Sequence, residues 1–379
     1  MRALLIFTSL LLVACASQRA EKVVLAPLPA IDNTITIKKI WQKNTNNGEA
    51  DLYLGLTAVS DSVDVFVASH KGIVQAYALE DGDALWRKDT SLALSMGPQV
   101  GTNLLIVGAV DGVVIALDKK TGERRWQADV AGEMLALPVI GDDVVVMRTI
   151  DGRLIALAAN SGKQQWQLKV DTPDLSGRGT SAPIINENLV VAGFDDGRLI
   201  ALDATNGRQV WQQQIGVAQG KNDIERLTDI DSTPVWVENI IYASALNQRV
   251  VSIQASSGRP LWSQNVYSRE PLTADWTRIY LTTPDDDVTA LRQSNGLTAW
   301  TQTALDNRQL SGPAVYGNWV LVGDVEGYLH VLTADNGHFV GRTRVASAPL
   351  RKPVQIIGEY VLAYAENGTV AVYSLTSSK

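Results

Sequence analysis

Short apolar runs separated by turn residues follow one another along almost the whole chain. Leu104–Val107 and Val113–Leu117 are two such runs, and Asp111-Gly112 stands between them. Glycine supplies the positive φ that a tight two-residue turn needs, so this pattern predicts a β-hairpin. A second turn over Lys119–Gly122 leads into a more polar run around Trp126. The segment therefore predicts consecutive antiparallel strands.

This unit recurs eight times with a fixed internal spacing. Counted from the glycine of the first turn, a second glycine falls at position +10 and a tryptophan at +14. The copies are Gly72/Gly82/Trp86, Gly112/Gly122/Trp126, Gly152/Gly162/Trp166, Gly197/Gly207/Trp211, the degraded Gln248/Gly258/Trp262, Asp286/Gly296/Trp300 and Gly327/Gly337/Gly341, and a half-copy at Gly368. A period near 40 residues with four short strands per unit is typical of a β-propeller.

Proline and tryptophan assign the strands within each unit. In five copies a proline lies 14 residues before the first turn position, at Pro98, Pro138, Pro183, Pro234 and Pro313. Proline is tolerated where the innermost strand begins, because no ladder donor is lost there. The outermost strand carries a tryptophan, whose large ring can fill the wedge between neighbouring blades. These structural tryptophans are Trp41, Trp86, Trp126, Trp166, Trp211, Trp262 and Trp300.

The two ends of the chain predict how the ring closes. The last copy, over residues 361–375, lacks a fourth strand, whereas Thr34–Trp41 has strand alternation and its own tryptophan. Pairing the N-terminal strand with the C-terminal three completes the eighth blade and removes an exposed edge. We therefore predict an all-β fold, an eight-bladed propeller of four-stranded antiparallel blades over residues 34–379. Seven blades with a stray strand is the alternative.

The N-terminus predicts export and lipidation. Residues 1–14 are a basic start and an apolar stretch too short to span a bilayer. The sequence Leu12-Val13-Ala14-Cys15 resembles a bacterial lipobox, in which the cysteine becomes lipid-modified, and Cys15 is the only cysteine of the chain. Residues 15–33 are then the lipidated cysteine and a flexible tether. Ala16 after the cysteine implies the outer membrane, and an ordinary signal peptide is the alternative.

Composition and motifs give little support for catalysis or nucleic-acid binding. The formal net charge is −7, or −8 after loss of Arg2, and no basic cluster is present. The three histidines, His70, His330 and His338, have no metal-site spacing, and Asp285–Asp287 lacks the alternating ligands of a calcium loop. No phosphate loop or nucleophile elbow occurs. We expect no cofactor, no metal and no enzymatic activity.

The repeat is interrupted where two successive connections between blades are lengthened. From the outer tryptophan to the next proline the chain takes 12 residues after Trp86, but 17 after Trp166 and 23 after Trp211. Such connections emerge on one face of a propeller, so the two should be neighbours. A third long connection, 41–58, lies on the same face at the other side of the ring.

The two lengthened connections combine apolar residues with charge of both signs. The apolar residues are Leu175, Ile224, Leu227 and Ile230, and the charged ones are Arg178, Arg226, Asp229 and Asp231. Apolar anchors within a charged rim are typical of a protein interface. The alternative is that the apolar side chains pack under their own loops and the charges are merely solvated.

A lipobox, a tether and a propeller with these connections together resemble the BamB family of outer-membrane protein assembly factors. The most specific segments are 175–179 and 229–234, and the resemblance covers essentially the whole mature chain. It implies a non-catalytic, periplasm-facing lipoprotein of the BAM complex that binds the POTRA domains of BamA and assists β-barrel insertion. The implied contacts are Leu175, Arg178, Asp229 and Asp231. Close relatives often have a leucine at Gly177, so one apolar contact is missing here.

The physical roles of these contacts can be anticipated. Leu175 would be the buried anchor, and Arg178 would offer its planar guanidinium to a carboxylate or carbonyl of the partner. Asp229 and Asp231 would contact the partner or hold the arginine loop in place. Unfolded outer-membrane clients are a further possible partner, through strand addition at a blade edge.

Two other functions remain open alternatives at this point. The repeat also resembles that of pyrroloquinoline-quinone (PQQ) dehydrogenases, although those enzymes are longer and many stack the cofactor on a vicinal disulfide that one cysteine cannot form. A glycan-binding periplasmic propeller is the second alternative.

Overall fold

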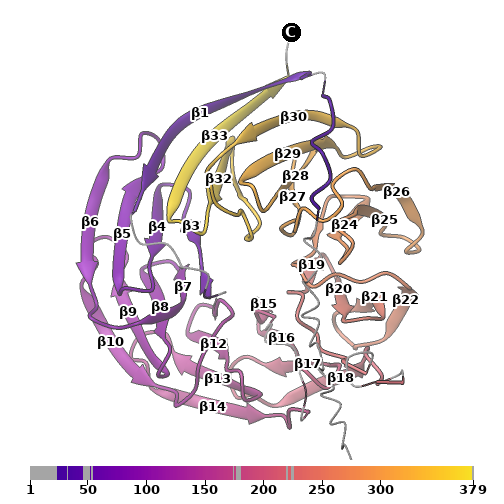
Figure 1. Cartoon of the computed structure of the whole chain (residues 1–379). Helices are drawn as coiled ribbons and strands as arrows, with labels where there is room; N and C mark the ends of the chain where they lie inside the picture. Colours follow the sequence, from indigo (N-terminus) through magenta and orange to yellow (C-terminus); the bar gives the residue numbers. More distant parts are fainter. Residues whose placement is uncertain are drawn as a thin grey trace, which may run out of the picture.

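The computed structural model describes residues 24–31, 33–45, 52, 54–173, 175, 181–218, 221–222 and 226–377. Within these ranges the chain forms strands joined by turns and irregular loops, and the strands are arranged as eight sheets around a central axis (Figure 1). Seven sheets have four strands and one has five. The prediction of eight blades is therefore confirmed. In the described part of the chain, no helix is long and apolar enough to cross a membrane.

In the first seven blades the four blade strands run outward from the axis in sequence order, and in the eighth the N-terminal strand β1 is outermost. The first four blades are β3 (Ala58–Ser60), β4 (Asp64–Ala68), β5 (Ile73–Ala78) and β6 (Ala84–Asp89); β7 (Leu94–Val100), β8 (Leu104–Ala109), β9 (Val113–Asp118) and β10 (Arg124–Asp129); β11 (Val139–Ile140), β12 (Val144–Arg148), β13 (Arg153–Ala158) and β14 (Gln164–Lys169); and β15 (Ile184–Asn186), β16 (Leu189–Gly193), β17 (Arg198–Asp203) and β18 (Gln209–Gln214).

The remaining four blades complete the ring. They are β19 (Val235–Val237), β20 (Ile240–Ala245), β21 (Arg249–Gln254) and β22 (Pro260–Gln264); β23 (Thr273–Ala274), β24 (Arg278–Thr282), β25 (Val288–Arg292) and β26 (Thr298–Gln302); β27 (Ala314–Tyr316), β28 (Trp319–Gly323), β29 (Tyr328–Thr333) and β30 (Phe339–Arg344); and β31 (Gln355–Ile357), β32 (Tyr360–Tyr364), β33 (Thr369–Ser377) and β1 (Ile35–Asn44).

The N-terminal strand closes the eighth blade, as predicted. β1 pairs antiparallel with β33, from Ile35 opposite Ser377 to Asn44 opposite Thr369, and forms the outer edge of that blade (Figure 1). The two ends of the chain are thus joined in one sheet, which ties the ring shut without leaving the last blade incomplete.

The second blade differs from the pattern that the prolines predicted. Pro98 lies inside β7 rather than at its start, because β7 extends back to Leu94. A two-residue strand, β2 (Gly55–Leu56), pairs in parallel with β7 at Met96 and Gly97 and makes this the five-stranded sheet. In the other four copies the proline directly precedes the inner strand, as expected.

The outer tryptophans join each blade to the next. A β-bulge just before the tryptophan shifts the register of the outer strand, as between Arg124 and Trp126. In Trp126 the indole Nε1 donates to the carbonyl of Ala159, 2.7 Å away in the third blade, and the ring packs on Gly162. The same pair of contacts, with the carbonyl and the glycine of the following blade, recurs at Trp41, Trp86, Trp166, Trp211, Trp262 and Trp300.

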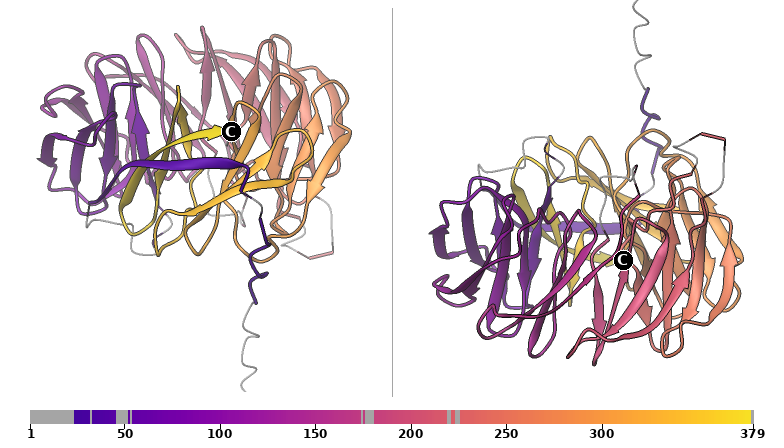
Figure 2. Two further views of the ribbon diagram at one scale, coloured as in Figure 1. Left: turned by 90° about the horizontal axis from the view of Figure 1, so that it is seen from above. Right: turned by 90° about the horizontal axis from the view of Figure 1, so that it is seen from below.

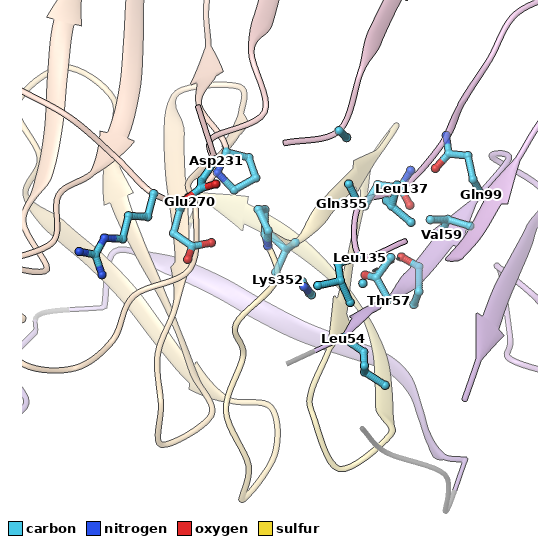
Figure 3. A pocket seen from close by; sticks show the side chains of 18 of the residues that line it. Leu54, Thr57, Val59, Gln99, Leu135, Leu137, Asp231, Glu270, Lys352 and Gln355 are labelled. Carbon is cyan, nitrogen blue, oxygen red and sulfur yellow. Dashed lines mark hydrogen bonds between the residues drawn. The ribbon is translucent and has the colours of Figure 1, made fainter. Parts of the chain in front are cut away.

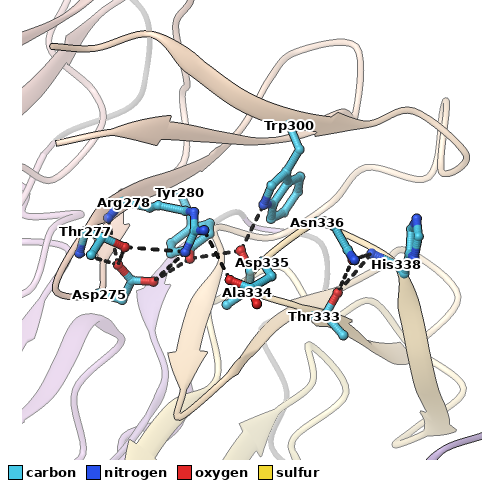
Figure 4. A network of polar contacts seen from close by, with 10 residues as sticks. All are labelled: Asp275, Thr277, Arg278, Tyr280, Trp300, Thr333, Ala334, Asp335, Asn336 and His338. Atoms are coloured by element: carbon cyan, nitrogen blue, oxygen red, sulfur yellow. Dashed lines mark hydrogen bonds and ion pairs between the residues drawn. The ribbon is translucent and has the colours of Figure 1, made fainter. Parts of the chain in front are cut away.

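Polar side chains reinforce the joint between the sixth and seventh blades (Figure 4). Trp300 Nε1 donates to the carbonyl of Ala334 at 2.8 Å, and the hydroxyl of Tyr280 donates to Asp275 Oδ2 at 2.5 Å. Arg278 reaches across to Asp335 at 3.1 Å. Burial and the Asp275 contact raise the pKa of Tyr280, so this hydroxyl stays protonated and serves as a donor.

The seventh blade has no tryptophan in its outer strand, and β1 fills the gap. Gly341 stands where the other copies have tryptophan, and a Cβ there would lie 2.7 Å from Ile35 Cγ1. Ile35 is buried in the core between the last two blades, and Ile37 packs against it. The degraded seventh copy is therefore the position that accommodates the closing strand.

Candidate functional site

The two lengthened connections lie next to each other, as the repeat predicted. The β14–β15 connection spans residues 170–183 and the β18–β19 connection spans 215–234. The amide of Ala182 in the first donates to Thr233 Oγ1 in the second, at 3.1 Å. In the second connection, the amide of Ile230 donates to the carbonyl of Phe194, in the turn after β16, at 3.2 Å. The second connection is thus bound to the fourth blade, and the end of the first connection, at Ala182, is bound to the second.

Leu175 is the exposed apolar residue of the first connection. Half of its surface, 50 %, is open to solvent, although leucine is usually buried. Arg178 and Ile224, which belong to the predicted interface, lie outside the described residues, as does Cys15. On the second connection Arg226 is exposed and Leu227 is half-buried.

Ile230 is not part of an exposed patch, and its prediction as an interface residue is wrong. Its side chain is fully buried in the core between the fourth and fifth blades, with Val191 and Trp211 among its neighbours. Gly193 of β16 makes room for it, because a Cβ at that position would lie 2.4 Å from Ile230 Cγ2. Ile230 therefore packs under its own loop and anchors the β18–β19 connection to the core.

The two aspartates have different positions. Asp229 has 0 % of its surface exposed, and its carbonyl accepts a hydrogen bond from the Leu246 amide at 2.9 Å. A partner protein cannot touch this side chain without unfolding the connection. Asp231 is half-buried and lines a central cavity. The sequence left two roles open for Asp229, direct contact with a partner and holding the connection in place. Its burial favours the second role.

A buried arginine that the sequence analysis missed faces this acidic group. Arg148, at the end of β12, has no exposed surface, forms an ion pair with Asp195 and stacks on Phe194 with its guanidinium carbon 5.3 Å from the ring centre. The connection is bound to the same turn, because Thr228 Oγ1 donates to the carbonyl of Asp195 at 3.1 Å. The signal was present in the repeat: Arg148 occupies a position at which the second and fourth copies have glycine.

The charge balance around Asp231 perturbs its ionisation. Burial, and next the negative charge of Asp229, raise the pKa of Asp231 to about 7. Asp195 acts in the same direction, whereas the positive charges of Arg148 and Arg269 oppose it. Asp231 Oδ1 has no hydrogen-bond partner among the described residues. This carboxyl group therefore changes charge near neutral pH.

A cavity of about 700 Å³ opens at the centre of this face (Figure 3). Asp231, Glu270 and Lys352 lie close together on one side of it, whereas Leu54 and Leu135 lie on the other. Burial raises the pKa of Glu270, against the opposing charges of Lys352 and Arg351. The lining is thus apolar on one side and of mixed charge on the other. Among the described residues, no group of three or more His, Cys, Asp or Glu side chains is placed to hold a metal ion.

Comparison with known sequences identifies the family. A model described as "Outer membrane protein assembly factor BamB" matches residues 70–302 and 286–378. The factor of that name from Pseudomonas aeruginosa is 38 % identical over 373 residues, covering 98 % of both chains. That from Escherichia coli K12 is 35 % identical over 381 residues, covering 97 % of this chain and 96 % of the relative.

Solved structures agree with this assignment, and they distinguish relatives of the same family from proteins that share only the propeller fold. BamB from Moraxella catarrhalis superposes with a TM-score of 0.82 at 27 % identity, covering 89 % of this chain and all (100 %) of that one. A quinohemoprotein alcohol dehydrogenase from Pseudomonas putida superposes with a TM-score of 0.71 at 14 % identity, covering 92 % and 77 %. At that identity only the propeller architecture is shared. The chain therefore belongs to the BamB family of outer membrane protein assembly factors.

Proposed function

We propose that this protein is a scaffold of the outer-membrane β-barrel assembly machinery, anchored to the outer membrane by a lipid on Cys15 and facing the periplasm. The surface that carries Leu175 and Arg178 would bind the POTRA domains of BamA. In this role the propeller performs no chemistry of its own. It would assist the assembly and insertion of β-barrel proteins by holding its partner in a defined position.

The observation that carries this proposal is an exposed leucine, Leu175, beside a neighbouring connection that is bound to the propeller. A half-exposed Leu175 offers apolar surface that a partner can bury. The neighbouring connection is tied down by Ile230 in the core and by the hydrogen bonds of Thr228 and Thr233. A preorganised surface loses little conformational entropy on binding, which favours affinity.

The buried acidic cluster gives the proposed role of Asp229 a physical basis. Asp229 and Asp231 lie in the connection that packs on the turn of Asp195, the ion-pair partner of Arg148. Replacement of the fully buried Asp229 would disturb the position of this connection, because removing one member of a buried charged cluster is strongly destabilising. We therefore assign Asp229 a positioning role and assign direct contact to Leu175 and Arg178.

The central cavity bears on the quinone alternative. A quinone cofactor of the PQQ type carries several carboxylates and would need predominantly positive surroundings. Here Arg269 and Lys352 share the lining with two carboxyl groups whose pKa burial raises, Asp231 and Glu270, and with apolar side chains such as Leu54. This mixture fits a polypeptide segment better than a polyanion, so the cavity is a candidate position for part of an unfolded client. A glycan-binding role has no comparable support.

The proposal is tested by binding of the propeller, residues 16–379, to the periplasmic region of BamA. We expect Leu175→Ala and Arg178→Ala each to weaken binding at least ~10-fold, about 1.4 kcal/mol. Leu297→Ala is the matched control: Leu297 is 53 % exposed, close to the 50 % of Leu175, but lies in the β25–β26 turn on the opposite face. Thermal unfolding would verify that all three variants remain folded.

Two outcomes would contradict the proposal. If Leu297→Ala weakened binding as much as Leu175→Ala, the contact would not be specific to the connection face. If the wild-type propeller failed to bind the BamA region at all, the scaffold role itself would be wrong. Soluble client peptides added to the same assay would show whether the cavity takes part, through competition or its absence.

A further inference from the structure

The segment before β1 is attached to the seventh blade, in contrast to the free tether that its composition predicted. We call residues 24–31 and 33–34 the strap. The amide of Ala26 donates to the carbonyl of Asp306 at 2.9 Å, and the amide of Thr34 donates to the carbonyl of Val340 at 3.0 Å. Figure 1 shows the strap (indigo) crossing the seventh blade from the outer edge toward the axis.

Two arginines of the propeller donate hydrogen bonds to carbonyl groups of the strap. Arg308 Nη1 donates to the carbonyl of Ala26 at 2.8 Å, and Arg342 Nη2 donates to the carbonyl of Pro29 at 2.6 Å. Hydrogen bonds from charged donors are stronger than neutral ones. Four hydrogen bonds therefore join the backbone of the strap to the propeller. The strap donates two of them and accepts the other two.

Arg308 belongs to a buried network built to position it. Only 2 % of its side chain is exposed, its Nε donates to Asp324 Oδ2 at 2.8 Å, and it also pairs with Glu326. His330 contacts the same Asp324 oxygen at 2.9 Å. The carbonyl of Ala26 thus completes the hydrogen bonds of a guanidinium that the propeller already holds in place with Asp324 and Glu326.

The exposure pattern of the strap is that of a docked, extended chain. Over residues 24–31, Val24, Pro27 and Ala30 are exposed and the residues between them are partly covered, whereas residues 33 and 34 are both exposed. One exposed position in three matches the three-residue turn of polyproline II, which Pro27 and Pro29 favour. A segment that is already extended loses little entropy on docking.

The strap leaves the ring on the face that carries the two lengthened connections. Asp306 and Arg308 belong to the β26–β27 connection, which is the same kind of inter-blade connection as β14–β15 and β18–β19. In an antiparallel blade ring all such connections emerge on one face. Both views of Figure 2 show the strap projecting from a single side of the ring.

Docking shortens the distance between the propeller and a lipid on Cys15. If the chain were free up to Ile35, twenty residue steps would span up to roughly 70 Å. With the strap docked, only the nine steps from Cys15 to Val24 remain, or at most roughly 30 Å. The tether then restricts orientation as well as distance.

We propose that the docked strap orients the propeller on its membrane, with the connection face that carries Leu175 directed toward the lipid surface. This inference rests on the lipidation of Cys15 proposed above. The strap serves as an orienting element that presents the partner-binding face at a set height above the bilayer. A free tether would present all faces of the ring equally.

Hydrogen exchange tests the docking without any membrane. In the soluble protein, residues 16–379, we expect the two strap amides that donate to the propeller, those of Ala26 and Thr34, to exchange at least ~10-fold more slowly than in Arg342→Met; in Ala26→Pro the Thr34 amide is the reporter. Ala26→Pro is the second variant: it removes the amide that donates to Asp306 and leaves the propeller unaltered, so it cannot fail through misfolding of the blades. Wild-type exchange as fast as in both variants would overturn the docked strap.

Energy transfer to labelled lipids tests the orientation. Because acylation uses the only cysteine, an introduced cysteine can be labelled singly in the lipidated full-length protein on vesicles. Thr172→Cys places the dye on the connection face, and Asp142→Cys places it in the β11–β12 turn of the same blade, on the opposite face. We expect stronger transfer from Thr172→Cys, and a smaller difference when Ala26→Pro is added.

The possible results separate this inference from the proposed function. Equal transfer from the two positions on vesicle-bound protein would overturn the orientation, even if exchange shows a docked strap. Protein that carries no lipid and does not bind vesicles would contradict the proposed anchor, and the orientation with it. Stronger transfer from the Asp142→Cys position would reverse the assigned face.

Discussion

Replacing Asp231 by asparagine isolates a carboxyl group whose ionisation the fold strongly perturbs. Burial and the charge of Asp229 raise its pKa from the ordinary 3.8 to about 7, with Asp195 adding to this and Arg148 and Arg269 opposing it. The unfolded chain releases this proton near its ordinary pKa, whereas the folded protein keeps it up to about pH 7. Between these values the folded state binds more protons, so its stability falls as the pH rises.

The size of the effect follows from the same two values. Each pH unit between the unfolded and folded pKa corresponds to about 1.4 kcal/mol, so ionised Asp231 costs up to roughly 4 kcal/mol above pH 7. Asparagine has the same shape and cannot ionise. We therefore expect Asp231→Asn to match the wild type near pH 4 and to exceed it by roughly 2–4 kcal/mol at pH 8.

Denaturant unfolding of both proteins at pH 4.5, 6, 7 and 8 measures this difference directly. Asp171→Asn removes an equal charge from an exposed position of the neighbouring connection and serves as the control. The reasoning would be refuted if the difference between Asp231→Asn and wild type did not change with pH. A variant less stable than wild type at pH 8 would show that the carboxylate is charged and well paired in the folded protein.

Two further predictions concern the joints between blades. Gly258→Ala should cost roughly 2–4 kcal/mol in denaturant unfolding, because φ is +71° and the new Cβ would lie 2.7 Å from the Trp211 ring. Gly317→Ala, with φ of +57° and no atom within 4 Å of its Cβ, should lose only about 1 kcal/mol; equal losses would contradict the packing argument. Trp211→Phe should cost about 1–3 kcal/mol, because the Ala255 carbonyl loses the donor now 2.7 Å away; an unchanged unfolding midpoint would show that this hydrogen bond contributes nothing.

The architecture could be predicted from the sequence because its determinants are local. A glycine with positive φ, as at Gly112, is required wherever the hairpin turns, and the same spacing then recurs in every blade. The closing strand was also predictable, since one end of the chain had a spare strand and the other lacked one. The start of β7 was not, because its pairing with β2 joins residues about 40 positions apart without a local signature.

The candidate site was predictable only in part. Lengthened spacing after Trp166 and Trp211 located both connections, and Leu175 is exposed as expected. Burial of Ile230 under its own loop remained one of two alternatives, because an isoleucine in a polar loop carries no sequence signal that separates burial from exposure. Gly193, which makes room for it, is 37 positions away.

By itself, the sequence determined the number of blades, the order of strands and the closure of the ring, because turn residues and apolar alternation act over a few neighbouring positions and repeat. Only the tertiary structure decided which polar residues meet in the interior. Arg148 of the third blade pairs with Asp195 of the neighbouring fourth blade, and Arg308 donates to the carbonyl of Ala26 in the segment before β1. Such pairs depend on how the blades and the chain ends are placed in space. A single sequence does not show which of its distant charged side chains will meet.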